Sequence, residues 1–323
     1  MDQNPAVRAR GISKSFGDVI ALDNVDLDVS SGQIHGLVGP NGAGKTTLLG
    51  LLLGLAVADS GTLEILGVRV GRSLEVPDGV AGFVDGPGLY PSLTPRRNLR
   101  ALASLRGHRA DIDDALEQVG LTDVADDPVR GFSLGMRQRL GLAAALLTEP
   151  RLLALDEPAN GLDPAGTRHV NRVLTDLAAR GTAIVLSSHR MDDLAALCSE
   201  VTILATGRVV FTGPISKLAA ESGELDYRIK VSHPELAGRI AAGTAEIRLL
   251  AGDDRMPRLD PETIVVRGPV PALDELVVGL VGQGIAIREL APVVAPLEAA
   301  FLALTGDADR PGSRSRSEPE EAR

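Results

Sequence analysis

Residues 39–47 read Gly-Pro-Asn-Gly-Ala-Gly-Lys-Thr-Thr, and this stretch does most to decide the fold. It satisfies the pattern G-x-x-x-x-G-K-[ST], in which glycines let successive backbone N–H groups converge on phosphate oxygens. The apolar run 34–38 before it predicts a buried strand, and the leucine-rich run 47–53 after it predicts a helix. This strand–loop–helix order disfavours a chance glycine turn. We therefore expect a nucleoside triphosphate bound by Gly39, Pro40, Asn41, Gly42, Ala43, Gly44, Lys45, Thr46 and Thr47.

Two carboxylates follow a second apolar run and extend this phosphate chemistry. Residues 152–155 read Leu-Leu-Ala-Leu and predict a buried strand, which ends at Asp156 and Glu157. Lys45 adds a positive charge to the loop, and the Thr46 hydroxyl and the Asp156 carboxylate are the oxygen donors expected for Mg²⁺. Glu157 is the candidate that orients or activates the attacking water. Without the loop at 39–47, two acids facing solvent would be the default interpretation.

Composition places the chain among ordinary globular proteins. Its 323 residues are 44% hydrophobic and 24% charged, and no apolar run reaches the ~18 residues of a membrane span. The net charge of −10 argues against broad nucleic-acid binding, which needs a basic surface. The first residues lack the pattern of a secretory signal, so we expect a cytoplasmic protein. The single cysteine, Cys198, predicts a buried apolar role rather than a reactive one.

The pattern along the chain predicts an α/β fold with two domains and a disordered tail. Short Val/Ile/Leu strands alternate with helices as far as about residue 212, but strands vanish between 89 and 148, which indicates an inserted helical subdomain. Beyond residue 222 the order β-α-β-β-α-β predicts a small ferredoxin-like α+β domain. The strands expected there include 226–231, 245–249, 263–267 and 286–290. We expect domains at 1–222, with the helical subdomain at about 88–148, and at 223–305, and disorder over 306–323.

Residues 132–140, Phe-Ser-Leu-Gly-Met-Arg-Gln-Arg-Leu, are the decisive further motif. Here the sequence resembles the ATP-binding cassette (ABC) ATPases, whose signature reads L-S-G-G-Q, with Ser133 and Gly135 retained. The S-L-G-M form is similar to the ATPases of type-2 exporters, including drug-resistance systems. Ser133 and Gly135 would begin a helix that offers a hydroxyl and backbone N–H groups to a phosphate. The resemblance implies that this phosphate belongs to a second copy in a head-to-tail dimer. Taken alone, Ser-x-Gly is only a helix cap.

Three further residues match the family and have a plainer alternative, and a fourth departs from its pattern. Asp163, in the segment Ala-Asn-Gly-Leu-Asp, matches the D-loop that joins the two sites, or else forms a turn before a helix over 164–179. His189 follows an apolar strand and matches the switch histidine at the γ-phosphate, whereas most lone histidines are structural. Phe16 matches the aromatic that stacks on adenine, or else packs in a core. Asp85 stands where glutamine is usual in the Q-loop, and its carboxylate is expected to contact Mg²⁺ or water.

The resemblance implies the ATP-hydrolysing subunit of an exporter, with ATP and Mg²⁺ bound and a separate integral-membrane permease as partner. The protein would lie on the inner face of the membrane through that permease and would bind no nucleic acid. Residues 85–98 are the expected docking surface, with the alternative that Leu89 and its neighbours pack the helical subdomain. An importer ATPase shares all this chemistry and stays open as an alternative, as does a non-transport regulatory ATPase. The transported compound is not encoded in this chain.

Overall fold

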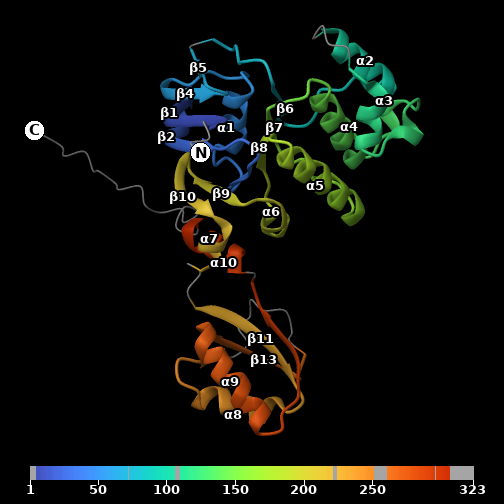
Figure 1. The fold of residues 1–323 in the computed structure, drawn as a ribbon. Helices are drawn as coiled ribbons and strands as arrows, with labels where there is room; N and C mark the ends of the chain where they lie inside the picture. The colour runs from blue at the N-terminus through green and yellow to red at the C-terminus, as the bar shows by residue number, and fades with distance from the viewer. Residues whose placement is uncertain are drawn as a thin grey trace, which may run out of the picture. The chain divides into compact units, whose positions relative to one another are not determined.

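The computed structural model describes residues 5–71, 73–105, 110–220, 224–250, 260–294 and 296–305, in two units divided between Ile215 and Ser216. The first unit contains two sheets (Figure 1). One has four antiparallel strands in the order β2-β1-β4-β5. The other has six strands in the order β10-β9-β3-β8-β7-β6, of which β9, β3, β8, β7 and β6 are parallel neighbours. The predicted α/β fold is confirmed, and the expected tail at 306–323 lies outside the described residues.

The strands of the first unit follow the apolar runs of the sequence. Parallel strands covered on both faces are near-continuous apolar runs, and every residue of β3, β7 and β8 is buried. Strands β3 and β7 have the bounds predicted above, and β8 is the apolar strand expected before His189, with the bounds 183–187 that its residues predict. The strands are β1 (Val7–Phe16), β2 (Val19–Val29), β3 (Ile34–Val38), β4 (Ser60–Ile65), β5 (Val68–Val70), β6 (Val80–Phe83), β7 (Leu152–Leu155), β8 (Ala183–Ser187), β9 (Glu200–Ala205) and β10 (Arg208–Pro214).

The helices of the first unit pack against the larger sheet or form a group of their own. Helix α5 buries an apolar stripe at helical spacing, and Asp163 is its N-cap, followed by a proline in the first turn. Helices α2, α3 and α4 gather in one group, as expected for an inserted helical subdomain (Figure 1). The helices are α1 (Lys45–Leu52), α2 (Pro95–Leu105), α3 (Ile112–Gln118), α4 (Leu134–Leu146), α5 (Pro164–Ala179) and α6 (Met191–Leu197), with short 3-10 turns at Thr122–Val124 and Val129–Gly131.

One hydrophobic core holds the two sheets and α1 together. It includes Ile12 and Leu22 of the antiparallel sheet, Leu37 of the parallel sheet, and Leu48 and Leu52 of α1, all essentially inaccessible to solvent. Helix α1 contacts β2 on one side and β7 and β8 on the other. Burying each such leucine contributes about 1.5–3 kcal/mol, so the start of α1 is firmly placed. The phosphate loop directly before α1 is therefore positioned by the best-packed part of the unit.

The second unit has the β-α-β-β-α-β order that the sequence predicts. Its four strands are all antiparallel in the order β12-β13-β11-β14, and Tyr227, Ile229, Ile264 and Leu276 are among the residues that form its own core. Strand β12 is shorter than the predicted 245–249, because Glu246 has a φ of 60°, which is incompatible with an extended strand. The elements are α7 (Ile215–Ala220), β11 (Leu225–Val231), α8 (Pro234–Gly243), β12 (Arg248–Leu249), β13 (Thr263–Gly268), α9 (Val270–Gly282), β14 (Ile287–Pro292) and α10 (Pro296–Thr305).

Candidate nucleotide site

The parallel strands bring four sequence-predicted segments to one edge of the sheet. Strands β3, β8, β7 and β6 are adjacent and run in the same direction, so the segments after their carboxyl ends lie side by side. Those segments are the loop 39–44, His189, the pair Asp156 and Glu157, and Asp85. Ligands of open α/β sheets bind at this edge. The candidate site is therefore built from segments that are up to 150 residues apart in the chain.

The phosphate loop ends in the conformation that an anion-binding helix start requires. Gly44 precedes α1 with a φ of 105°, and a Cβ there would lie 2.4 Å from the Ala21 carbonyl oxygen, so only glycine fits. The Lys45 ammonium is buried and donates to the carbonyl oxygens of Gly39, at 2.7 Å, and Pro40, at 3.1 Å. Burial lowers the pKa of Lys45, although the nearby Glu157 and Asp156 carboxylates oppose that shift.

Asp156 joins the phosphate loop to the neighbouring strands. The Thr46 hydroxyl donates to Asp156 Oδ2 at 3.0 Å, and the Ser187 hydroxyl donates to Oδ1 at 2.5 Å. The Asp85 backbone N–H points at the same Oδ2 from 3.5 Å, while the Asp85 side chain is exposed. Asp156 itself is 7% exposed. A hydroxyl and a carboxylate held together in this way are hard oxygen donors, the kind of ligands that suit Mg²⁺.

Glu157 contacts three parts of the chain. Its carboxylate Oε2 lies 2.8 Å from Nδ1 of His189, its backbone N–H donates to the Ser187 hydroxyl at 2.9 Å, and its carbonyl accepts from Gln138 Nε2 at 3.5 Å. The residue has a φ of 49°, a left-handed conformation that is costly for a residue with a side chain. The carboxylate and the imidazole expected to act on the same phosphate are thus in direct contact.

Ser187 and Gln138 are the residues of this site that the sequence pattern did not single out. Ser187 is fully buried and its hydroxyl bonds both Asp156 and Glu157. Gln138 is 5% exposed, and its Oε1 is buried with no hydrogen-bond partner among the described residues. The available signal for Ser187 was its position at the end of an apolar strand two residues before His189. Gln138 carries no such signal, because its partner is a backbone carbonyl 19 residues away.

Phe16 is exposed beside the phosphate loop, rather than packed in the core. It ends β1, is 53% exposed, and pairs with Val19 across a tight turn. Ala21, two residues after Val19, contacts the phosphate loop at Gly44. The Lys14 ammonium lies 5.2 Å from the centre of the Phe16 ring. The ring is therefore available for a flat ligand group.

The signature and D-loop residues form a second group away from the phosphate loop. The Ser133 hydroxyl caps α4 by accepting the Met136 N–H at 3.2 Å, and Asp163 caps α5 by accepting the Gly166 N–H at 2.7 Å. Gly135 is buried against Gly161. Among the hydrogen bonds of the described chain, none joins Ser133 to residues 39–47. Within one chain, Ser133 and Asp163 cap the starts of α4 and α5, and the Ser133 side chain is exposed.

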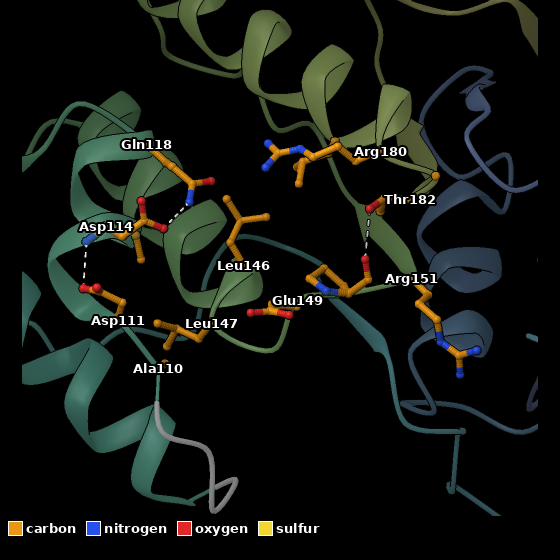
Figure 2. Close-up of a pocket in the computed structure, with 14 residues that line it drawn as sticks. Ala110, Asp111, Asp114, Gln118, Leu146, Leu147, Glu149, Arg151, Arg180 and Thr182 are labelled. Atoms are coloured by element: carbon orange, nitrogen blue, oxygen red, sulfur yellow. Dashed lines mark hydrogen bonds between the residues drawn. The ribbon is translucent and has the colours of Figure 1, made fainter.

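A cavity of about 620 Å³ lies elsewhere, between α3, the end of α4 and the end of α5 (Figure 2). Arg151 and Thr182 in its wall directly precede β7 and β8, so it lies at the amino-terminal edge of the sheet. Figure 2 shows Glu149 between Leu147 and Arg151 in this wall. None of the predicted site residues lines it, and we keep it apart from the nucleotide site.

Comparison with known proteins decides the family. Residues 22–160 match the family model described as ABC transporter. The chain is 35% identical over 305 residues to the ABC transporter ATP-binding protein YdbJ of Bacillus subtilis, covering 93% of this chain and 96% of that protein. The chain belongs to the ABC transporter family. It is an ATP-hydrolysing cassette of that family, and its predicted membership and activity are confirmed.

Two further comparisons bear on this ABC ATPase. It is 36% identical over 314 residues to the daunorubicin resistance ATP-binding protein DrrA3 of Streptomyces coeruleorubidus, covering 94% of this chain and 96% of that protein. The structure of a dimeric ATP-binding cassette bound to ADP and phosphate superposes with a TM-score of 0.58 at 22% identity, covering 64% of this chain and 98% of that one. At 22% identity, the similarity to the dimeric cassette concerns the fold alone. Among the described residues, no helix has both the length and the apolarity to cross a bilayer.

Proposed function

We propose that this ABC ATPase powers an exporter, working as a head-to-tail pair on a separate membrane permease. The observation that carries the proposal is the hydrogen-bonded cluster of Asp156, Glu157, Ser187 and His189 beside the phosphate loop. The export direction is supported by the similarity, over nearly the whole chain, to a protein named for daunorubicin resistance. Drug or lipid-like molecules are the proposed cargo class. The alternative is an importer ATPase, and the transport experiment below distinguishes the two.

The phosphate loop and Lys45 would hold the triphosphate of ATP. The positive charge of Lys45 interacts with the carboxylates of Glu157 and Asp156. A bound triphosphate would compete with these carboxylates for the Lys45 ammonium. Thr46 and Asp156 present paired oxygens that fit Mg²⁺, and we assign them as its ligands, with Asp85 as a further acidic group near the same carboxylate. Bound Mg²⁺ would offset the negative charge that phosphoryl transfer develops. The exposed Phe16 ring would stack on adenine.

Glu157 would act on the attacking water, and His189 would contact the γ-phosphate. The contact between Glu157 Oε2 and His189 Nδ1 at 2.8 Å supports a joint role for the two groups at one phosphate. A water held between the carboxylate and the γ-phosphate would lose its proton to Glu157 as its oxygen bonds to phosphorus, while the bond from phosphorus to the bridging oxygen breaks and ADP leaves. The imidazole side chain is 60% accessible, and its Nε2 would donate to a phosphate oxygen when the ring carries a hydrogen on both nitrogens.

A second copy would complete each site. The exposed Ser133 hydroxyl stands at the start of the 13-residue helix α4, where unpaired N–H groups favour an anion. The phosphate loop of the same chain lies elsewhere, so we assign the Ser133 hydroxyl and the Gly135 backbone to the partner's ATP. Asp163, on the segment that follows Glu157, would join the two sites. The ATP-binding cassette of the same fold that binds ADP and phosphate is a dimer.

The permease would dock on residues 85–98. The buried Asn98 side chain accepts the Tyr90 N–H at 2.8 Å and donates to the Tyr90 carbonyl at 3.1 Å, which holds this loop in place. The Tyr90 side chain remains 52% exposed, while Leu89 and Leu93 are half-buried against the helical group. A fixed loop that presents an aromatic side chain suits a protein partner. The protein would then lie on the cytoplasmic face of the membrane through this partner.

The proposal also assigns the parts of the chain. Residues 1–222 carry the ATP chemistry, including the helical subdomain at about 88–148, and residues 223–305 form an appended domain without a catalytic motif. The core of the second unit is separate and apolar, and its strands carry several ion pairs, such as the bidentate pair of Arg267 and Asp226 at 2.6 and 2.9 Å. Those features support a stable accessory domain rather than a second active site.

Transport by inside-out vesicles tests the function. The tagged chain is purified with the permease that accompanies it, and the complex is reconstituted with Mg-ATP and daunorubicin outside the vesicles. ATP-dependent accumulation inside is expected for export, and it should vanish in Lys45→Ala, which removes the phosphate-binding charge. Accumulation that requires ATP trapped on the opposite side would contradict export. Unchanged nucleotide titration of Lys45→Ala would contradict the phosphate-loop assignment.

A further inference from the structure

The side chain of Leu134 covers Gly161. A Cβ built on Gly161 would lie 2.6 Å from Leu134 Cδ2 and 2.7 Å from Cγ, distances that real Cβ atoms do not show. Gly161 also has a φ of 74°, which favours glycine by itself. Leu134 is 50% exposed, so one side of it faces solvent and the other rests on this glycine. The two residues are therefore matched in size.

Gly135 makes the reciprocal contact. A Cβ on Gly135 would lie 2.8 Å from the Gly161 carbonyl oxygen and 2.8 Å from Leu162 Cδ2. The start of α4 thus packs closely against the segment 157–163. Residues 134 and 135 on one side contact residues 161 and 162 on the other. Such an interface cannot slide without a clash, because packed protein interiors have little free volume.

Gln138 adds a polar contact between the same two segments. Its amide donates to the Glu157 carbonyl at 3.5 Å, at the long end of the hydrogen-bond range, from a nearly inaccessible position on α4. The Glu157 N–H is held on the other side by Ser187. The left-handed backbone of Glu157 is therefore held between α4 and β8.

These contacts connect two functional residues that do not touch. Ser133 lies at the start of α4, and Glu157 begins the segment that contains Gly161. Under the proposed function, on which this inference rests, Ser133 contacts the partner's ATP and Glu157 acts on the ATP of its own chain. A shift of α4 toward the partner would carry the segment 157–163 with it. The interface is placed to couple the two ATP sites within one chain.

We propose that the Leu134–Gly161 contact is a positioning link that sets Glu157 for hydrolysis according to the state of Ser133. Leu134 stands where the L-S-G-G-Q signature has glycine, so the matched glycine at 161 is what allows the larger residue. In this proposal the Leu134 side chain and Gly161 act through the placement of Glu157, not through a contact with ATP. Hydrolysis requires that the sizes of the residues at 134 and 161 fit each other, rather than the identity of either residue alone.

A double-mutant cycle on the complete complex with its permease tests the link. Gly161→Ala introduces a Cβ that clashes with Leu134, Leu134→Gly removes the covering side chain, and the double variant exchanges the two sizes. We expect Gly161→Ala to lower kcat at least about tenfold with KM for ATP changed by less than about twofold, since misplacement of a reacting group affects turnover. The double variant should recover most of that loss, because the glycine at 134 vacates the space that the new methyl group needs.

A matched control isolates the clash from backbone strain. Gly284 has a φ of 75°, nearly that of Gly161, but a Cβ there would meet nothing within 4 Å. Gly284→Ala should therefore show the stability cost of backbone strain alone while leaving kcat unchanged. A kcat in the double variant equal to the product of the two single effects would overturn the proposal, as would unchanged kcat in Gly161→Ala.

A reference variant separates this inference from the proposed function. Glu157→Gln is measured beside the cycle in the same complex. If turnover is lost in Glu157→Gln but the cycle is additive, the link fails and the function stands. If Glu157→Gln hydrolyses ATP normally, the proposed function fails at its central residue, and the link loses its purpose with it.

Discussion

Nδ1 of His189 and Oε2 of Glu157 lie 2.8 Å apart, although 32 residues separate them in the chain. An ionised carboxylate only accepts hydrogen bonds, so in this contact Nδ1 carries the hydrogen. The contact orients the imidazole through the carboxylate. It also means that a substitution at either residue disturbs the other.

Neutralising Glu157 should separate ATP binding from hydrolysis. In Glu157→Gln we expect turnover to fall at least about 100-fold, because an amide cannot accept the proton of the attacking water. ATP affinity should stay within about threefold, since the phosphate loop is unchanged and one negative charge is removed. Single-turnover hydrolysis and fluorescent-nucleotide titration measure the two quantities.

Glu149 offers the matched control for that substitution. It has a φ of 46°, close to the 49° of Glu157, but it is exposed and remote from the phosphate loop. Glu149→Gln should therefore hydrolyse ATP at the normal rate. Equal losses in the two variants would indicate a general effect of charge, and Glu157 would lose its assigned role.

Ser187 should matter for both stability and turnover. Ser187→Ala leaves Asp156 Oδ1 and the Glu157 N–H without their hydrogen-bond partner in a buried position, which costs about 1–3 kcal/mol of unfolding free energy. Because both carboxylate residues lose an anchor, kcat should fall at least about tenfold. Urea unfolding and steady-state kinetics provide the measurements. Ser188→Ala, one residue further, is the control for kcat, because the Ser188 hydroxyl bonds the Arg190 backbone rather than Asp156 or Glu157. A similar fall in kcat there would contradict the specific role of Ser187.

The sequence predicted the elements whose residues share one environment. Strands β3, β7 and β8 are buried at every position, so nearly continuous apolar runs marked their bounds. The sequence predicts a strand at 25–29, but β2 begins at Val19: its first four residues are apolar, yet most of this half is exposed or half-buried and is held by pairing with β1. The three-residue edge strand β5, which pairs with β4, was not predicted either. Partly buried strands depend on neighbours that a local pattern does not contain.

The site divides in a similar way. The phosphate loop, Asp156, Glu157 and His189 follow strands directly, and parallel pairing then brings them together without further information. The links between them were not predictable, because Ser187 and Gln138 bind backbone groups or carboxylates of another segment. The fit of Leu134 on Gly161 likewise depends on how α4 packs against the loop after β7. Such contacts are set by tertiary packing.

Phe16 should control ATP affinity rather than the chemical step. Phe16→Ala removes an exposed ring, and we expect KM for ATP to rise about 2- to 10-fold, the usual scale of an aromatic stacking contact. Phe16→Tyr should retain the wild-type KM, and kcat should be unchanged in both. Steady-state kinetics with ATP and GTP measure this, since stacking distinguishes bases weakly. An unchanged KM in Phe16→Ala would return this ring to a structural role.

Buried His35 should make folding stability depend on pH. It is 1% exposed on β3, its Nε2 lies 2.8 Å from the Thr202 hydroxyl, and its Nδ1 has no partner among the described residues. Burial lowers the pKa of His35 to about 4, against 6.5 for a solvated histidine. Between these two values the unfolded chain binds a proton that the folded chain does not. Stability from this group is therefore complete above pH 6.5 and is lost as the pH falls toward 4.

The total loss expected from His35 is about 3 kcal/mol, since each pKa unit corresponds to about 1.4 kcal/mol. Replacing the imidazole by a non-titrating amide in His35→Gln should flatten the profile of unfolding free energy between pH 7 and 5. The variant should be less stable than the wild type at pH 7.5, because the replacement packs less well, and the difference should narrow on acidification. His169, which is partly buried and bonds the Gln118 carbonyl, serves as control in His169→Gln. A difference between His35→Gln and the wild type that stays constant from pH 7.5 to 5 would contradict a neutral buried imidazole at position 35.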